Sequence, residues 1–353
     1  MQTNKEITFA KAIDLTLLKL FKKDKNSFLM GLGVNDPKSI FNTTESIKNA
    51  FPNRVFDMPL SENSMTGVTI GASLRGLKPI LVHQRLDFAM LSMEQIINQA
   101  AKWYYMFDGQ KNIPLIIRMI VGRGWGQGPQ HSQSLQSLFS HIPGLKVVMP
   151  STTESVQQLL VDSFYDNNPV IFIEHRWLHN IKGKELKNIK KKKLGKSKIL
   201  KKGKDITIVS NSFMTVEMLR ILKNLRSKKV DIELIDLQSI SPLDTNTLVN
   251  SVKKTGRLLV LDTGHKSFGI SGEIISIITE QCFSKLKSKP ERIANPDYPV
   301  PTSFALAKHY YPSKYYICSK IFEMLNINEK PPEILFSKDL YQDQPFKDFT
   351  GPF

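Results

Sequence analysis

Short apolar runs alternate with longer stretches of helical period along the first half of the chain. Residues 28–30, 79–82, 115–120, 145–149 and 170–173 are rich in aliphatic side chains and predict five strands. Thr3 and Glu6 have the spacing of a helix capping box, and the apolar positions from Ile7 to Leu20 predict a first helix that ends near Lys23. This alternation is typical of a mostly parallel sheet with helices on both faces.

The same alternation restarts after the lysine-rich stretch at residues 190–193. Strands are predicted at 206–210, 232–237 and 258–262, with helices between them. We therefore predict an α/β protein with two doubly wound, mostly parallel-sheet domains, at residues 1–185 and 201–328, joined by a basic linker at 186–200. Residues 329–353 show no sustained period, and they predict an extended tail whose aromatic residues dock on a neighbouring chain.

Composition narrows the class of protein. The 353 residues are 41% hydrophobic, which is enough for two cores. No signal-peptide pattern and no apolar stretch of about 18 residues is visible, so we expect a soluble cytoplasmic protein. The two cysteines, Cys282 and Cys318, are too few for a disulfide framework or a metal site. The net charge of +17 would suit nucleic acid or acidic membranes, but its lysines are spread thinly without a recognition motif, so we expect neither partner.

An acidic residue, Glu62, lies where a predicted strand is followed by a helix. Residues 55–76 read VFDMPLSENSMTGVTIGASLRG: a short strand, a turn at Pro59, then a helix. Ligands of open parallel sheets bind at this carboxyl edge, which makes Glu62 a candidate site residue. Met58, Leu60 and Met65 would make its surroundings apolar. The structural alternatives are a first-turn acid favoured by the helix dipole and a capping carboxylate.

A glycine-rich loop follows the strand predicted at 115–120. Residues 123–131 read RGWGQGPQH, and a loop is the only element that so many glycines and a proline allow. The loop should emerge at the same sheet edge as Glu62 and carry His131 there. A neutral imidazole can pass protons near neutral pH, although a solitary loop histidine is more often a bystander.

Six segments, in order along the chain, carry a resemblance to a known family. They read DMPLSENSMTGVTIGASLRGLKPI, LDFAMLSMEQIINQAAKWYYM, GQGPQHSQSLQSLFSHIPGLKVVMPS, DNNPVIFIEH, LIDLQSISPLD and KKTGRLLVLDTG. The chain resembles the beta subunit of the thiamine-diphosphate-dependent decarboxylating component of pyruvate and branched-chain 2-oxo acid dehydrogenases, in the transketolase superfamily. The resemblance covers most of residues 1–320, and it implies a transketolase pyrimidine-binding domain followed by a transketolase C-terminal domain.

The resemblance implies roles for three residues. Glu62 would bond a ring nitrogen of the cofactor's aminopyrimidine, favouring the tautomer whose exocyclic nitrogen removes the acidic thiazolium proton. Phe88 would stack on the pyrimidine face, with plain core packing in a helix through Met93 and Ile97 as the alternative. His131, in the triplet QHS, would face the substrate as an acid/base and positioning group.

The resemblance also implies partners and ions. Thiamine enzymes usually hold the diphosphate through a divalent metal on a GDG motif, which this sequence lacks. An alpha-type subunit would therefore supply the diphosphate and magnesium site, in a heterotetramer of two alpha and two beta chains, and a lipoyl acyltransferase is a further expected partner. Some family members bind potassium through backbone carbonyls, for which an ordinary helix C-terminus is the alternative. The matching positions are Leu115, Ser163, Phe164, Asp166 and Asn168.

Some positions depart from the family. Residues 31–33, GLG, stand where the family has an acidic turn, and residues 84–86, QRL, replace a less charged run, which indicates a different substrate. Gln238 and Ser241 replace arginines near a region that some members use to bind the acyltransferase core. The expected function is oxidative decarboxylation of a 2-oxo acid, an oxidoreductase activity. The alternatives are a split transketolase-like or acyloin-forming enzyme subunit, and a non-catalytic basic binding protein on the same fold.

Overall fold

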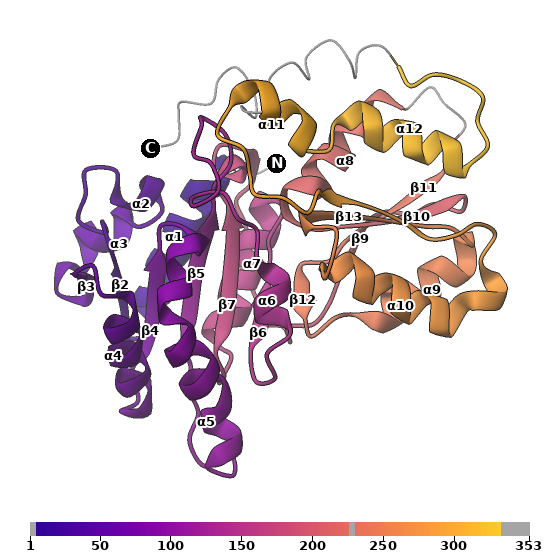
Figure 1. Ribbon diagram of the computed structural model, residues 1–353. Coiled ribbons are helices and arrows are strands. Elements are labelled where there is room, and N and C mark those ends of the chain that lie inside the picture. The colour runs from indigo at the N-terminus through magenta and orange to yellow at the C-terminus, as the bar shows by residue number, and fades with distance from the viewer. Residues whose placement is uncertain (1–4, 226–229, 333–353) are drawn as a thin grey trace.

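The computed structural model describes residues 5–225 and 230–332, in which two open sheets lie side by side (Figure 1). The first has the strand order β12-β6-β7-β5-β4-β2-β3. Its parallel strands are β2 (Ser27–Gly31), β3 (Val55–Asp57), β4 (Lys78–His83), β5 (Ile116–Val121), β6 (Lys146–Val148) and β7 (Val170–His175). The edge strand β12 (Ser239–Ser241) comes from the second half of the chain and runs antiparallel to β6.

Both faces of the first sheet are buried because successive side chains of a strand point to opposite sides. Ile116 and Ile120 of β5 face a core shared with α1 (Phe9–Lys23), α3 (Glu45–Ala50) and α7 (Thr153–Phe164). Ile117 and Met119 face the opposite core, which is covered by α4 (Glu62–Leu74), α5 (Ala101–Met106) and α6 (Gln136–Ser140). Continuous aliphatic runs, rather than alternating ones, are what such a doubly covered strand requires.

The second sheet has the order β14-β13-β10-β11-β9. Four strands are parallel, namely β10 (Ile206–Ser210), β11 (Ile232–Asp236), β13 (Leu258–His265) and β14 (Glu291–Asn295), whereas β9 (Lys198–Lys201) is an antiparallel edge. Its covering helices are α8 (Ser212–Asn224), α9 (Thr245–Thr255), α10 (Ile270–Cys282) and α12 (Lys314–Met324), and α11 (Phe304–Tyr310) follows β14. Residues of α9 and α10 belong to the same hydrophobic cluster as α4 and α6, so the two halves share a core.

Most of the predicted architecture is confirmed. Each of the nine predicted strands, including the short one before Glu62, is present with ends shifted by a few residues at most, and the α/β class with two mostly parallel sheets is as expected. The predicted start of the first helix is wrong, because Glu6 lies in β1 (Glu6–Thr8), which pairs with β8 (Lys182–Lys184). The helix is capped instead by Thr8, whose hydroxyl accepts a hydrogen bond from the Lys11 amide.

The predicted tail and the proposed capping residue Thr3 fall outside what the structure describes, apart from residues 329–332. Between the two sheets, the basic stretch runs along α7, where the Lys192 amide donates to Asp162 and Gln158 donates to the Lys190 carbonyl. In the described ranges, no helix is long and apolar enough to cross a membrane.

A buried ion pair joins β5 to β7 in the middle of the first sheet. Arg118 and Glu174 are both fully buried, and two nitrogens of the guanidinium lie 2.6 and 3.1 Å from the two carboxylate oxygens. Burial would raise the pKa of Glu174, but Arg118 and a hydrogen bond with His179 outweigh it and lower that pKa to about 2. Charge pairing of this quality lets the sheet bury an arginine.

Candidate functional site

Glu62 lies at the first position of α4, just beyond the carboxyl end of β3. The chain turns tightly before it, since the Ser61 amide donates to the Pro59 carbonyl at 2.7 Å. Glu62 is 7% exposed, and none of the residues in the described ranges donates a hydrogen bond to its carboxylate. The capping alternative therefore does not apply. Leu60 is 78% exposed, so the expectation that it encloses Glu62 is wrong within this chain.

The loop after β5 brings His131 against Phe88. Their ring centroids are 5.4 Å apart, and the rings meet edge to face at 85°. Phe88 belongs to a 3-10 helix, η2 (Leu86–Ser92), which is followed by a π-helical turn, η3 (Gln95–Ala100), in place of the regular helix that the sequence predicted. Phe88 is partly exposed, so it is not plain core. The helix α4 packs against both η2 and η3, which puts Glu62 and Phe88 on neighbouring elements.

Close packing fixes the shape of the loop. A Cβ atom at Gly122 would collide with the backbone oxygen of His131, so only glycine permits this fold of the loop onto its own start. Gln127 accepts a hydrogen bond from Arg85 Nε at 3.0 Å, which ties the middle of the loop to the strand end at β4. The loop is thus held at its start by the close approach of Gly122 to His131, and at its middle by the hydrogen bond to Gln127.

The segment that follows His131 is fastened to the second half of the chain. Ser134 Oγ lies 2.9 Å from Thr263 Oγ1, and Gln136 Nε2 donates to Asp262 Oδ1 at 2.6 Å. Asp262 and Thr263 belong to β13 of the second domain, so the second domain positions this loop of the first domain. Sequence inspection missed this coupling because it joins residues more than 120 positions apart.

Asp87, next to Phe88, is a buried acid that sequence inspection also missed. Its Oδ1 accepts hydrogen bonds from the Gln133 amide at 3.3 Å and from Gln133 Nε2 at 2.8 Å. Burial raises the pKa of the Asp87 carboxyl, and the bonds from Gln133 and the charge of His131 partly offset that rise. The Asp87 carboxyl therefore lies buried close to the His131 ring, at the wall where the loop meets η2.

A cavity of about 500 Å³, named here the His131 cavity, lies beside these groups. Its wall includes Asp36, Lys38, Phe41, Arg85, Phe88 and His131. Glu62 is not part of this wall. The His131 imidazole and the Phe88 ring therefore line one cavity, and the Glu62 carboxylate lies on the neighbouring helix α4. Such a site can orient a planar ring system and exchange protons with it.

The five positions matched to potassium do lie around the end of α7 and the start of β5. The Leu115 carbonyl accepts a bond from the Val170 amide at 2.9 Å, and the Ser163 carbonyl accepts one from the Asp166 amide at 3.1 Å. Lys146 Nζ is 2.6 Å from both oxygens of Asp166. That ammonium already offsets the negative charge here, so the residues fit a cation only in part.

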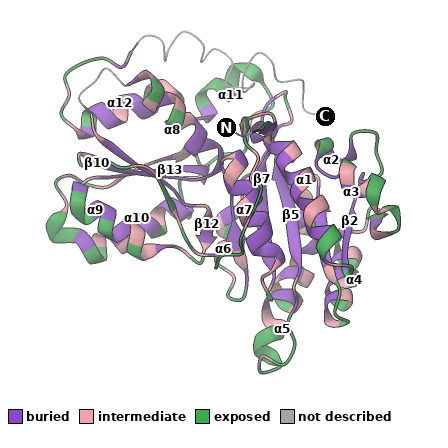
Figure 2. Ribbon diagram, turned by 180° about the vertical axis from the view of Figure 1, so that it is seen from behind, coloured by how far each residue is buried: buried purple, intermediate pink, exposed green. Residues whose placement is uncertain are grey.

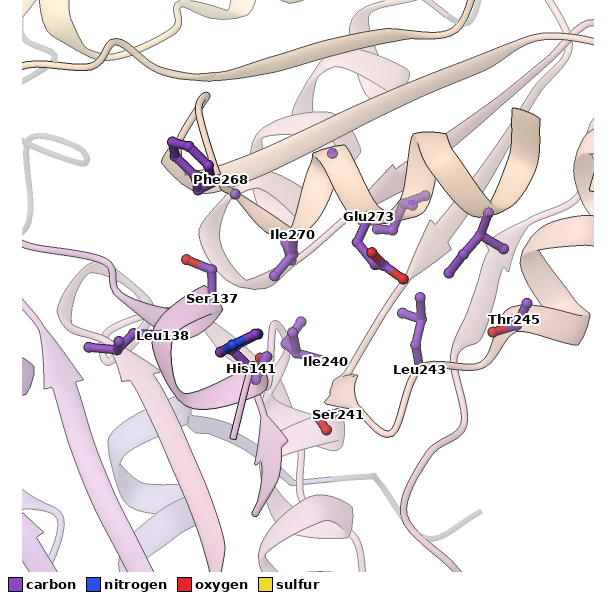
Figure 3. Close-up of a pocket in the computed structure, with 15 residues that line it drawn as sticks. Ser137, Leu138, His141, Ile240, Ser241, Leu243, Thr245, Phe268, Ile270 and Glu273 are labelled. Atoms are coloured by element: carbon purple, nitrogen blue, oxygen red, sulfur yellow. The ribbon is translucent and has the colours of Figure 1, made fainter. Parts of the chain in front are cut away.

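A larger cavity of about 1010 Å³ opens between the two halves (Figure 3). Ser137 of α6 and His141, which directly follows α6, line it on one side, and β12 and α10 contribute Ser241 and Glu273. Phe268, at its rim, is 97% exposed. None of the predicted site residues lines this cavity, and no local sequence pattern could reveal it because its walls come from distant segments.

Comparison with known protein families assigns both halves of the chain. Residues 5–181 match the family model of the transketolase pyrimidine binding domain, and residues 195–317 match that of the transketolase C-terminal domain. Among solved structures, one named split gene transketolase, inactive beta4 tetramer, superposes with a TM-score of 0.73 at 20% identity. The match covers 92% of this chain and 99% of that one, and shows that the fold is shared.

Curated relatives are more similar in sequence. The beta subunit of acetoin:2,6-dichlorophenolindophenol oxidoreductase of Cupriavidus necator is 38% identical over 274 residues, which cover 78% of this chain and 81% of that protein. The pyruvate dehydrogenase E1 component subunit beta of Rickettsia bellii is 35% identical over 317 residues, covering 90% and 98% respectively. A mitochondrial pyruvate dehydrogenase beta subunit of Oryza sativa is 34% identical over 87% of this chain and 84% of that protein.

Proposed function

Because this chain belongs to the family of transketolase-type beta subunits that includes those of pyruvate dehydrogenase, we propose that it is the beta subunit of a thiamine-diphosphate-dependent 2-oxo acid dehydrogenase. Together with an alpha-type subunit it would decarboxylate a 2-oxo acid oxidatively. The observation that carries the proposal is the unpaired, buried Glu62 carboxylate beside the helix of Phe88, which contacts His131.

The residues present fit the pyrimidine half of the cofactor. When bound, thiamine diphosphate supplies the nucleophilic carbon and the electron sink for decarboxylation. Glu62 is 7% exposed and its carboxylate accepts no hydrogen bond from a described residue, so it is available to a donor such as a protonated ring nitrogen. Glu62 would hold a proton at that nitrogen and so fix the tautomer of the ring. Phe88 would orient the ring by stacking.

His131 would act on the substrate side. Its ring stands edge to face with Phe88 at a cavity wall, where it can orient a bound donor and pass a proton to or from its oxygen. Glu62, Phe88 and His131 together favour catalysis over the non-catalytic alternative, which has no need of all three.

An alpha-type partner is part of the proposal. The sequence lacks the GDG motif for the diphosphate, so magnesium and the diphosphate would be held by that subunit. Large apolar side chains next to Glu62, on η2 and on α5 are left open to solvent: Leu60 is 78% exposed, Leu91 65% and Tyr105 89%. Figure 2 shows α5 exposed at one end of the molecule. Exposed apolar surface of this kind is characteristic of subunit interfaces.

Two finer points belong to the proposal as well. The second candidate activity is acyloin cleavage, which the 38% identity to the acetoin oxidoreductase subunit favours. A cytoplasmic location is proposed, although the Oryza relative is named as mitochondrial. A lipoyl acyltransferase as the acceptor partner is retained from the family resemblance alone.

The first experiment is calorimetric titration with thiamine diphosphate and magnesium. We expect no binding by this chain alone and tight binding after it is mixed with its alpha-type partner, because each subunit holds half of the cofactor. Absence of binding by the mixture would contradict the proposal and favour the non-catalytic alternative.

Substitution of His131 by alanine should impair the later part of the reaction. With the alpha-type subunit present, we expect acyl transfer to lipoamide to fall about 100-fold, which is typical for loss of an acid/base group. Cofactor affinity, measured by calorimetry, should change little, because His131 lies on the substrate side. Equal losses of affinity and turnover would indicate a structural role instead.

The proposed potassium site near Leu115 and Asp166 is disfavoured by the nearby Lys146 ammonium. If the site is occupied, the melting temperature will be higher in potassium chloride than in sodium chloride at equal ionic strength, since a ligand that binds only the folded state stabilises it. Identical melting curves would remove potassium from the proposal.

A further inference from the structure

The His131 cavity contains a buried arginine that forms no direct ion pair with a carboxylate among the described residues, although Asp87 lies nearby. Arg85 is 5% exposed and lines the cavity together with His131 and Phe88. Its Nε donates to Gln127 and its Nη1 donates to the Gln84 carbonyl at 2.8 Å. Over the same described ranges, no acceptor lies on Nη2 and no carboxylate forms an ion pair with Arg85.

Elsewhere in the same sheet, the chain neutralises a buried arginine. Arg118 lies on the neighbouring strand β5 and meets both oxygens of Glu174. Taking a guanidinium out of water without a counter-charge is costly, so a fold keeps one only where something else offsets it. Arg118 has a structural counter-ion, whereas Arg85 faces a cavity.

Phe41, which lines the cavity, lies near two guanidinium groups. The Phe41 ring lies 5.3 Å from the guanidinium carbon of Arg85 and 4.4 Å from that of Arg176. Burial lowers the pKa of Arg85 to about 10, which leaves it charged at neutral pH. At the rim, the exposed Asp36 and Lys38 carry opposite charges, whereas the guanidinium of Arg85 lies deeper, with the Asp87 carboxylate nearby but not in an ion pair with it.

The segment that holds Phe41 in place is strained. Residues 39–42 all have positive φ angles, between 41° and 62°, although none of them is glycine. A run of left-handed residues costs roughly 1–2 kcal/mol per residue and persists only where the surroundings enforce it. Such strain concentrates at ligand-binding sites, and here it sets the aromatic ring between the two guanidinium groups.

Building on the proposed function, we propose that Arg85 binds an anionic group, a carboxylate or a phosphate, at the end of the donor substrate remote from the bond that is cleaved. A carboxylate that leaves as carbon dioxide loses its charge in the transition state. An arginine bound to that carboxylate would stabilise the ground state more than the transition state and slow the reaction. The remote end of the donor has no such conflict, and Arg85 can bind it throughout.

The test compares donors of equal length with and without the remote charge. The pairs are 2-oxoglutarate with 2-oxopentanoate, and xylulose 5-phosphate with xylulose, each assayed with the heterotetramer and 2,6-dichlorophenolindophenol as acceptor. We expect one charged donor to be preferred, and the pair that shows the preference identifies carboxylate or phosphate. Arg85→Gln should lower kcat/KM for that donor roughly 10- to 100-fold, mostly through KM, as for a lost hydrogen bond to a charged group.

Two further variants guard against a folding artefact. Arg85→Lys keeps the charge, so it should retain part of the preference. Arg54→Gln is the matched control, because Arg54 also lies over an aromatic ring, 4.1 Å from the Phe51 centroid, and bonds backbone carbonyls, but outside the His131 cavity. It should leave the preference unchanged. Calorimetry on the cofactor-free heterotetramer adds a readout without turnover, in which Arg85→Gln should weaken binding of the charged donor alone.

Two results would overturn the inference: no preference for a charged donor in the wild-type protein, or equal losses for charged and uncharged donors in Arg85→Gln. Failure of the proposed function is recognised separately, by absence of deuterium exchange at C2 of bound thiamine diphosphate. Exchange that persists in Arg85→Gln, with only the charged donor affected, supports both the function and the anion site.

Discussion

Glu62→Gln in the heterotetramer should abolish most of the turnover, by a factor of about 1,000, while the protein still folds and assembles. Glutamine has the shape of the carboxyl group but cannot hold a proton for the cofactor's ring nitrogen. The melting temperature should stay the same or rise, because no described residue donates a hydrogen bond to the Glu62 carboxylate and the substitution removes a buried charge. Deuterium exchange at C2 of bound thiamine diphosphate measures the activation step directly.

The matched control for this variant is Glu45→Gln. Glu45 is likewise a first-turn acid, of α3, but it is exposed. If Glu62 acted only through the helix dipole, both variants would lose a few tenths of a kcal/mol to about 1 kcal/mol of stability and neither would lose exchange. Normal exchange in Glu62→Gln would refute the activating role.

Glu174→Gln should give the largest loss of stability, about 3–5 kcal/mol, because it leaves the Arg118 guanidinium buried without its counter-charge. On the scale of domains of about 150–250 residues this corresponds to a fall in melting temperature of roughly 6–20 °C. The folded-state pKa of Glu174 is lowered to about 2 from 4.5. Its contribution to stability is therefore complete above pH 4.5 and is lost as the pH falls towards 2. Between pH 4.5 and 2, the melting temperature of the variant should therefore fall less steeply with decreasing pH than that of the wild-type protein.

A surface ion pair provides the comparison. Lys19 lies 3.0 Å from Glu185, with the two side chains 41% and 22% exposed, so Glu185→Gln should cost less than about 1 kcal/mol. Replacing both members of the buried pair with methionine should recover much of the lost stability, since the penalty comes from an unpaired charge. A Glu174→Gln protein as stable as Glu185→Gln would show that the buried pair contributes little.

The strands could be predicted because each is a doubly buried, continuous apolar run, which only a covered parallel sheet accommodates. The start of the first helix was mispredicted for a local reason. Glu6 fits a capping box, yet it pairs with Lys184 in β1 and β8, a contact set by residues far along the chain. The short strand β12 was likewise invisible, because its partner β6 belongs to the other half.

The fold class and most of the strands could be read from the local pattern of apolar residues, and Glu62, Phe88 and His131 could be found because each stands in a contiguous motif. The contact of His131 with Phe88, the bonds between the second domain and the loop, and the burial of Arg85 at the same cavity are visible only in the folded chain. Each of these contacts joins residues that are far apart in the sequence and meet only when the chain packs. A local sequence pattern never contains both residues of such a contact.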